Sequence, residues 1–305
     1  MKNPKGLFLM AFSILTRGSV LILLILFALW VEYINLKNGY NNPRLVELSQ
    51  GVLWRWFYEL SDAFFSLFGD PMEVMQTNGG MTWSIRVFGV PFTDPVALLS
   101  ILVKNMHAPL GFLLGALIPI TLSILFGRIF CAYICPASLL FFTISRLRRN
   151  LQKFFYFPEL QFSPSLGFGV LAGGLTLAYF TSHGVWALIL PYFAVGQSIF
   201  QGIAFGVLAP TIYSLLFFSL FDLILARQFT CRFLCPTGQL LGLLGRKSVI
   251  RLKREASQCL SGCQSCDLVC PLQVQPRLDF TANCSLCAEC VAICPTGCLK
   301  IGVRT

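Results

Sequence analysis

The sequence predicts an all-α membrane protein, a four-helix transmembrane bundle of two repeated hairpins, followed by a small cysteine-rich α+β domain. Of the 305 residues, 56% are hydrophobic and only 12% are charged, whereas a soluble domain carries about a quarter charged residues. Nine of the 13 cysteines lie within 259–298, and the other four form two CxxxCP motifs. The low charge excludes both a purely soluble protein and intrinsic disorder.

Four apolar segments are long enough to cross a bilayer, which takes about 20 helical residues. They cover about 19–36, 107–130, 165–182 and 207–226. We interpret the first as an uncleaved anchor rather than a signal peptide, because no small-residue cleavage site follows Trp30. The apolar segment 183–206 is open to another interpretation, as a re-entrant piece or as a replacement for one of these spans.

The positions of the basic residues predict the orientation. Of the 23 Lys and Arg residues, 18 lie before the first span, between the second and third spans, or in the tail. Only five lie in the loop 37–106, and 183–206 has none. Because basic residues gather on the cytoplasmic side, we expect a bacterial inner-membrane protein with several spans and both termini in the cytoplasm. The aromatic segment 52–68 then predicts a helix at the outer interface.

The two CxxxCP motifs form an internal repeat with an offset of 100 residues. Cys131 and Cys135 follow the second span, and Cys231 and Cys235 follow the fourth. Residues i and i+4 share a helix face, and proline ends or restarts a helix. If the two hairpins pack around a pseudo-twofold axis, the four thiols converge. Four thiolates suit an Fe–S cluster or zinc, although buried cysteines with a packing role are the alternative.

The tail carries two runs of four cysteines that each end in Cys-Pro. The second run matches the bacterial ferredoxin pattern C-x2-C-x2-C-x3-C-P, and the first has one extra residue after Cys259. In that pattern the fourth cysteine of each run ligates the other cluster. We therefore predict two [4Fe–4S] clusters in a ferredoxin-like domain, 251–305, which follows a transmembrane domain, 1–250. The iron ligands are Cys259, Cys263, Cys266 and Cys294 for cluster 1, and Cys270, Cys284, Cys287 and Cys290 for cluster 2. Separate zinc sites fit this spacing poorly, and Cys298 is expected to pack beside the clusters without binding iron.

The order of these features resembles the NapH family of membrane-bound ferredoxin-type proteins, the quinol dehydrogenase component of periplasmic nitrate reductase systems. It is also similar to MauN of methylamine utilisation and to the membrane and ferredoxin parts of NosR. The resemblance spans about 15–300 and is carried by the CxxxCP cysteines and the eight ferredoxin cysteines. It implies electron transfer between the quinol pool and a redox partner carrying haem or further Fe–S clusters. The sequence shows no CxxCH, Walker A or GxGxxG motif.

On this basis we expect a membrane iron–sulfur subunit that oxidises quinol, with no nucleic-acid partner. Candidate proton acceptors of a quinol site are His107, His183 and Asp222, since histidine titrates near neutral pH and acids in spans are usually functional. Asp222 is alternatively a partner of Arg227 or Arg128. The segment 52–68 alternatively forms the edge of a quinol-binding site. Two other functions stay open: electron flow from cytoplasmic donors outward across the membrane, and a redox-sensing or assembly role for another metalloenzyme.

Overall fold

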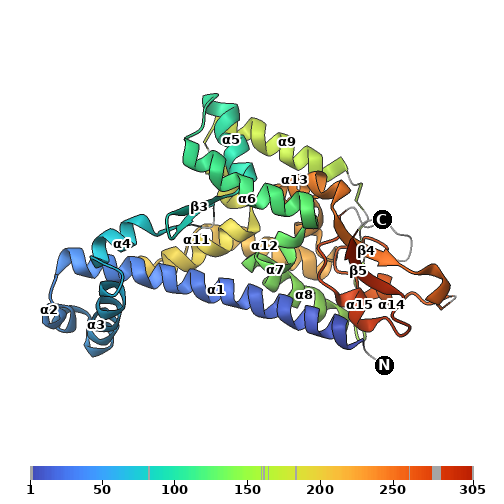
Figure 1. The fold of residues 1–305 in the computed structure, drawn as a ribbon, viewed down its shortest axis with the longest axis horizontal. Helices are drawn as coiled ribbons and strands as arrows, with labels where there is room; N and C mark the ends of the chain where they lie inside the picture. The colour runs from blue at the N-terminus through green and yellow to red at the C-terminus, as the bar shows by residue number, and fades with distance from the viewer. Residues whose placement is uncertain are drawn as a thin grey trace.

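The structure, a computed structural model, describes residues 3–81, 83–158, 160, 162–163, 165–182, 184–260, 262–276 and 283–303. Its longest element is helix α1 (Pro4–Gly39), which runs the length of the molecule from the cysteine-rich domain to the opposite end (Figure 1). Pro4 occupies the first turn, where its missing N–H has no helical partner to lose. The Asn3 side chain caps the helix by accepting a hydrogen bond from the Lys5 backbone N–H at 3.2 Å.

Within the described residues, α1 is the one helix that is both long and apolar enough to cross a membrane. The other predicted spans coincide with α6 (Leu110–Phe126), α9 (Ser165–Phe180) and α12 (Thr211–Ile224), which have 17, 16 and 14 residues. All three are shorter than the segments predicted from hydropathy. Helix α6 ends where Gly127 takes a left-handed φ of 67°, a conformation that terminates helices. The structure therefore replaces four similar spans with one long helix and three short apolar ones.

The predicted outer loop 37–106 is folded rather than extended. Its elements are α2 (Pro43–Gln50), α3 (Val52–Ser66), α4 (Pro71–Thr77), β1 (Gly79–Met81), β2 (Ser84–Val87), β3 (Val90–Thr93) and α5 (Pro95–Asn105). The strands form an antiparallel sheet in the order β1-β2-β3. Helix α3 is the helix expected over 52–68, and its Phe65 ring packs edge-on against Trp30 of α1, with ring centroids 5.1 Å apart. These contacts hold α3 at the end of α1 opposite the cysteine-rich domain (Figure 1).

The two CxxxCP motifs lie in matching local structures. Helix α6 is followed by α7 (Ile129–Tyr133) and α8 (Pro136–Leu151), and α12 by the π-helical turn η1 (Thr230–Leu234) and α13 (Pro236–Leu244). The Cys135 backbone N–H donates to the Phe130 carbonyl, and the Cys235 N–H donates to the Thr230 carbonyl, both at 2.9 Å. In each copy the second cysteine precedes a proline that opens the next helix.

The main core lies between these two copies. Its buried residues include Trp186, Phe141 and Tyr192, with Cys135 and Cys235 among them. The segment 183–206 contributes two short helices, α10 (Val185–Ile189) and α11 (Pro191–Ala204). The CxxxCP cysteines are thus part of the central packing of the fold.

The cysteine-rich tail forms a small α+β unit at one end of the molecule (Figure 1). Its elements are η2 (Gly245–Lys247), β4 (Ile250–Arg254), η3 (Ala256–Gln258), α14 (Ser265–Val269), α15 (Glu289–Ile293) and β5 (Leu299–Val303). Strands β4 and β5 are antiparallel and pair Ile250 with Val303 at one end and Arg254 with Leu299 at the other. The first turn of α1 packs on α15: Gly6 lies against the Ala292 backbone, and the Asn3 N–H donates to the Ala292 carbonyl at 3.1 Å.

Candidate functional site

The four cysteines predicted for cluster 1 line one small pocket of the tail. They are Cys259, Cys263, Cys266 and Cys294. Cys298, which was expected only to pack nearby, lines the same pocket and is joined to Cys259 by a disulfide with Cα atoms 5.4 Å apart. Its sulfur also lies 3.5 Å from the Cys294 Sγ. The pocket therefore holds five sulfur atoms, one more than a cubane needs.

The four cysteines predicted for cluster 2 line a second, separate pocket. They are Cys270, Cys284, Cys287 and Cys290. The loop turns its thiols inward by adopting left-handed φ values at Leu286 (57°) and Ala288 (61°). The Leu286 N–H donates to the Cys284 Sγ at 3.4 Å. Burial raises the pKa of the Cys284 thiol to about 12, so without iron this site favours protonated thiols.

The donor set of each tail pocket has the chemistry that a cubane requires, because a [4Fe–4S] cluster is held by four cysteine thiolates. Within the described parts of the chain, no three His, Cys, Asp or Glu side chains are placed to hold one metal ion. The two sets of four follow the crossed pattern, in which the last cysteine of each run turns to the other pocket.

The four CxxxCP cysteines come together between α7, η1 and the helices that follow. We call them the cysteine quartet: Cys131, Cys135, Cys231 and Cys235. The Cys231 thiol is close enough to the other three for their charges to interact. The Cys235 Sγ accepts a hydrogen bond from the Gly238 N–H at 3.5 Å, at the start of α13. The quartet thus forms from both copies of the repeat.

Two buried arginines lie between the quartet and the cluster 2 pocket. Arg128 donates from Nη2 to the Cys231 carbonyl at 2.8 Å, and its charge acts on both Cys235 and Cys284. Arg17 of α1 donates to the Ser138 Oγ at 3.3 Å, and its charge acts on both Cys135 and Cys287. Each side chain is about 1% exposed. The two guanidinium groups would therefore offset the negative charge that either set of cysteines would carry as thiolate ligands.

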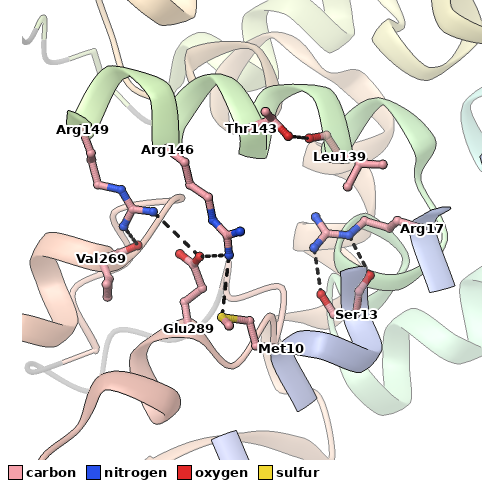
Figure 2. Close-up of polar contacts among 9 residues, drawn as sticks. All are labelled: Met10, Ser13, Arg17, Leu139, Thr143, Arg146, Arg149, Val269 and Glu289. Atoms are coloured by element: carbon pink, nitrogen blue, oxygen red, sulfur yellow. Dashed lines mark hydrogen bonds and ion pairs between the residues drawn. The ribbon is translucent and has the colours of Figure 1, made fainter. Parts of the chain in front are cut away.

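Direct contacts also join the tail to the first motif and to α8. The Tyr133 hydroxyl, within the first CxxxCP motif, donates to the Leu286 carbonyl at 3.2 Å. Figure 2 shows Arg146 and Arg149 of α8 reaching Glu289, with Nη2–Oε1 distances of 3.0 and 3.9 Å. Glu289 is only 5% exposed and lies between the cluster 2 ligands Cys287 and Cys290. The cysteine spacing gives no sign that Glu289 has a structural role, because its partners Arg146 and Arg149 lie far away in the sequence.

The two predicted quinol-site residues that the structure describes lie in different surroundings. His107 is exposed in the turn between α5 and α6, and His183 lies outside the described residues. Asp222 is buried beside the quartet, and its Oδ1 accepts hydrogen bonds from the backbone N–H and the hydroxyl of Thr230, both at 3.0 Å. The Asp222 backbone carbonyl accepts a hydrogen bond from Arg148 Nη1 at 3.1 Å. Because Thr230 is the first residue of η1, these hydrogen bonds from Thr230 to the Asp222 carboxylate anchor the turn that carries Cys231.

Comparison with known proteins agrees with this arrangement. A protein family described as "4Fe-4S binding domain" matches residues 108–154 and 208–255, each containing one CxxxCP motif. The "Ferredoxin-type protein NapH" of Haemophilus influenzae is 27% identical over 83% of this chain and 90% of its own length. The NapH protein of Escherichia coli is 29% identical over 74% of this chain and 80% of its own length. No solved structure matches the fold.

A third relative has a higher sequence identity to this chain than these two. The "Methylamine utilization ferredoxin-type protein MauN" of Methylobacillus flagellatus is 31% identical over 68% of this chain and 71% of its own length. The matched relatives thus cover the repeat and most of the chain. Together with the paired cysteine motifs, they show that the chain belongs to the NapH and MauN family of ferredoxin-type iron–sulfur proteins.

Proposed function

We propose that this protein is a membrane-embedded electron-transfer subunit that oxidises quinol and delivers electrons to a partner redox protein. Two [4Fe–4S] clusters are held by the tail cysteines, and a third Fe–S centre by the quartet. When bound, such clusters supply one-electron transfer at potentials set by charge, hydrogen bonds and burial. The four apolar segments cross the inner membrane, with the tail and both termini in the cytoplasm.

One observation carries this proposal: the quartet and the cluster 2 cysteines are neighbours. Tyr133 bridges the two cysteine motifs through its hydrogen bond to Leu286. The charges of Arg128 and Arg17 act on cysteines of both sets. Cysteines that served only to fill a hydrophobic core would need neither the Tyr133 hydrogen bond nor the nearby charges of Arg128 and Arg17. Shared positive charge is instead what two adjacent anionic centres require, because it stabilises their reduced forms.

The order of the sites along the molecule follows from the same contacts. Cluster 2 lies next to the quartet, and cluster 1 lies beyond it, against Arg254, whose Nε is 3.4 Å from the Cys259 Sγ. A cluster bound by the cluster 2 cysteines would therefore be the one placed to exchange electrons with a centre at the quartet, and a cluster bound by the cluster 1 cysteines would be the one placed to exchange them with a partner. A partner docks at the cluster 1 end of the tail.

The test is low-temperature EPR, with iron and labile sulfide counts, on anaerobically purified protein. Samples are measured as isolated, with a menaquinol analogue, and with dithionite. Reduction by the quinol analogue, at about eight irons per chain for two cubanes or about twelve with a third, supports the proposal. Reduction by dithionite alone points to low-potential cytoplasmic donors and reverses the electron direction. Zinc without iron would contradict the iron–sulfur assignment altogether.

A further inference from the structure

A cavity of about 210 Å³ lies directly beside the cysteine quartet. Its walls are mainly apolar, and they include Val20, Leu24, Ile118, Leu122, Phe130 and Ile134. Phe130 directly precedes the first CxxxCP motif, and Ile134 lies within it, next to Cys135. The lining comes from α1 and from both copies of the repeat, and its apolar character suits an apolar molecule.

Three polar side chains from separate parts of the chain converge on this cavity. Asp94 immediately precedes α5, Tyr192 lies in the first turn of α11, and Thr237 lies in the first turn of α13. The Asp94 Oδ2 accepts hydrogen bonds from the Tyr192 hydroxyl and, at 2.8 Å, from the Thr237 hydroxyl. All three side chains are less than 10% exposed. A carboxylate, a phenol and a hydroxyl thus form one polar spot in a mainly apolar cavity, which Thr93 also lines.

The polar spot adjoins the quartet. Thr237 follows Cys235 by two residues and lines the cavity. Tyr192 belongs to the same buried core cluster as Cys135 and Cys235. A molecule that hydrogen-bonds to Asp94 therefore sits next to a site that we assign to a one-electron centre.

Helix capping explains only part of this arrangement. The Asp94 Oδ1 accepts from the Val96 N–H at 2.5 Å, as an N-cap of α5 does. Capping does not require a second oxygen bonded to Tyr192 and Thr237, nor an apolar cavity beside it. A buried carboxylate is costly unless it is hydrogen-bonded, and a serine cap would satisfy Val96 without introducing that charge, so capping alone does not account for an aspartate at this position.

We propose, on the basis of the quinol-oxidising function proposed above, that this cavity binds the ring of a quinol. One ring hydroxyl hydrogen-bonds to Asp94 and Tyr192, and Thr237 supports the carboxylate from the other side. The apolar walls from α1 and α6 contact the ring faces, and the quinol tail extends toward the lipid. Of the residues predicted as proton acceptors, the described His107 and Asp222 do not line this cavity.

The test measures binding and cluster reduction in the same full-length protein, in lipid nanodiscs under argon. The probe is 2,3-dimethyl-1,4-naphthoquinol, and 2,3-dimethylnaphthalene, which lacks both oxygens, is the matched apolar probe. We expect Tyr192→Phe and Thr237→Val to weaken quinol binding about tenfold, as loss of one hydrogen bond to a charged group does. Leu122→Trp fills the cavity and abolishes binding. Ser198→Ala, on the same helix as Tyr192 but outside the cavity, is the control with unchanged binding.

The outcomes separate this inference from the proposed function. Dithionite-reduced EPR intensity and thermal unfolding confirm that each variant is loaded and folded. If quinol reduces the wild-type clusters but Tyr192→Phe, Thr237→Val and Leu122→Trp all bind it normally, the site is wrong and the function stands. If quinol neither binds nor reduces the wild type, the function itself fails. Equal affinity for the two probes overturns the role of the three polar residues and indicates a cavity for lipid chains.

Discussion

The Tyr133 hydroxyl donates a hydrogen bond to the Leu286 carbonyl, 3.2 Å away, and so ties the first CxxxCP motif to the middle of a ferredoxin motif. Tyr133 lies between Cys131 and Cys135, and Leu286 lies between Cys284 and Cys287. A single hydrogen bond thus links two cysteine-bearing loops that are 153 residues apart in sequence. If both loops bind iron as proposed, this contact fixes how the two sites lie relative to each other.

Replacing Tyr133 with Phe removes this hydrogen bond and keeps the ring. We expect full iron content but slower reduction of the tail clusters by the quinol analogue, because the loops lose their fixed spacing. Stopped-flow absorbance gives the rate, and chemical iron analysis gives the loading. Tyr179→Phe, an exposed tyrosine at the end of α9, controls for loss of a phenol. An unchanged rate would show that the loop spacing is set elsewhere.

Replacing Arg128 with Gln removes one of the two buried charges between the quartet and cluster 2. Reduction adds negative charge, so loss of a nearby cation makes the reduced state less stable and the midpoint potential more negative. A tenfold change in the reduction equilibrium corresponds to about 59 mV for one electron, and we expect a shift of about that size. Potentiometric EPR titration measures it.

Two companion variants show whether charge or packing is responsible for the Arg128 effect. Arg128→Lys retains the charge and is expected to keep the potential near the wild-type value. Arg246→Gln changes the net charge equally at an exposed position, where solvent screens it. If Arg128→Gln and Arg246→Gln shift the potential equally, the buried position of Arg128 has no special role.

Glu289 holds the tail against α8 through Arg146 and Arg149. Removing one partner of a largely buried ion pair is destabilising, because the other charge is left unpaired. Since Arg146 is 40% exposed, we expect Glu289→Ala to cost about 1–2 kcal/mol, below the range for fully buried pairs. Limited proteolysis of the tail and thermal unfolding in lipid report the loss. A double-mutant cycle with Arg146→Ala isolates the pair, and additive effects would contradict the coupling.

The five sulfur atoms of the cluster 1 pocket allow two ligand sets, and one pair of variants distinguishes them. With Cys259 as the ligand, Cys259→Ser loses about four irons per chain, the content of one cubane. Cys298→Ser then keeps its iron, and it also loads more readily after exposure to air because Cys259 can no longer form a disulfide. Anaerobic iron and sulfide analysis compares them. The reverse pattern would assign Cys298 as the ligand.

The cysteine spacing predicted much of this site because iron–sulfur binding depends on short-range sequence geometry. The eight tail cysteines fall into the two sets that the ferredoxin pattern indicates, and the repeat offset of 100 residues pairs Cys131 with Cys231. These features are local, so a single sequence carries them.

The remaining features depend on tertiary contacts that no local pattern shows. Hydropathy gave no reason for α6 to end at Phe126, because the cause is the backbone conformation of Gly127. In the sequence Asp94 is one of several acids in the loop 37–106. In the fold its carboxylate accepts a hydrogen bond from Thr237, which lies 143 residues further along the chain. Glu289 and Arg17 likewise gain their roles only when α1, α8 and the tail are packed together.

The three short apolar helices have a consequence for the membrane itself. Helices of 14–17 residues extend about 21–26 Å at 1.5 Å per residue, less than the roughly 30 Å hydrocarbon thickness of a typical bilayer. Such hydrophobic mismatch is relieved by local thinning of the bilayer. In the proposed multi-span topology, the bilayer around these three helices is thinner than elsewhere, so the two aqueous faces of the membrane lie closer together around the quartet.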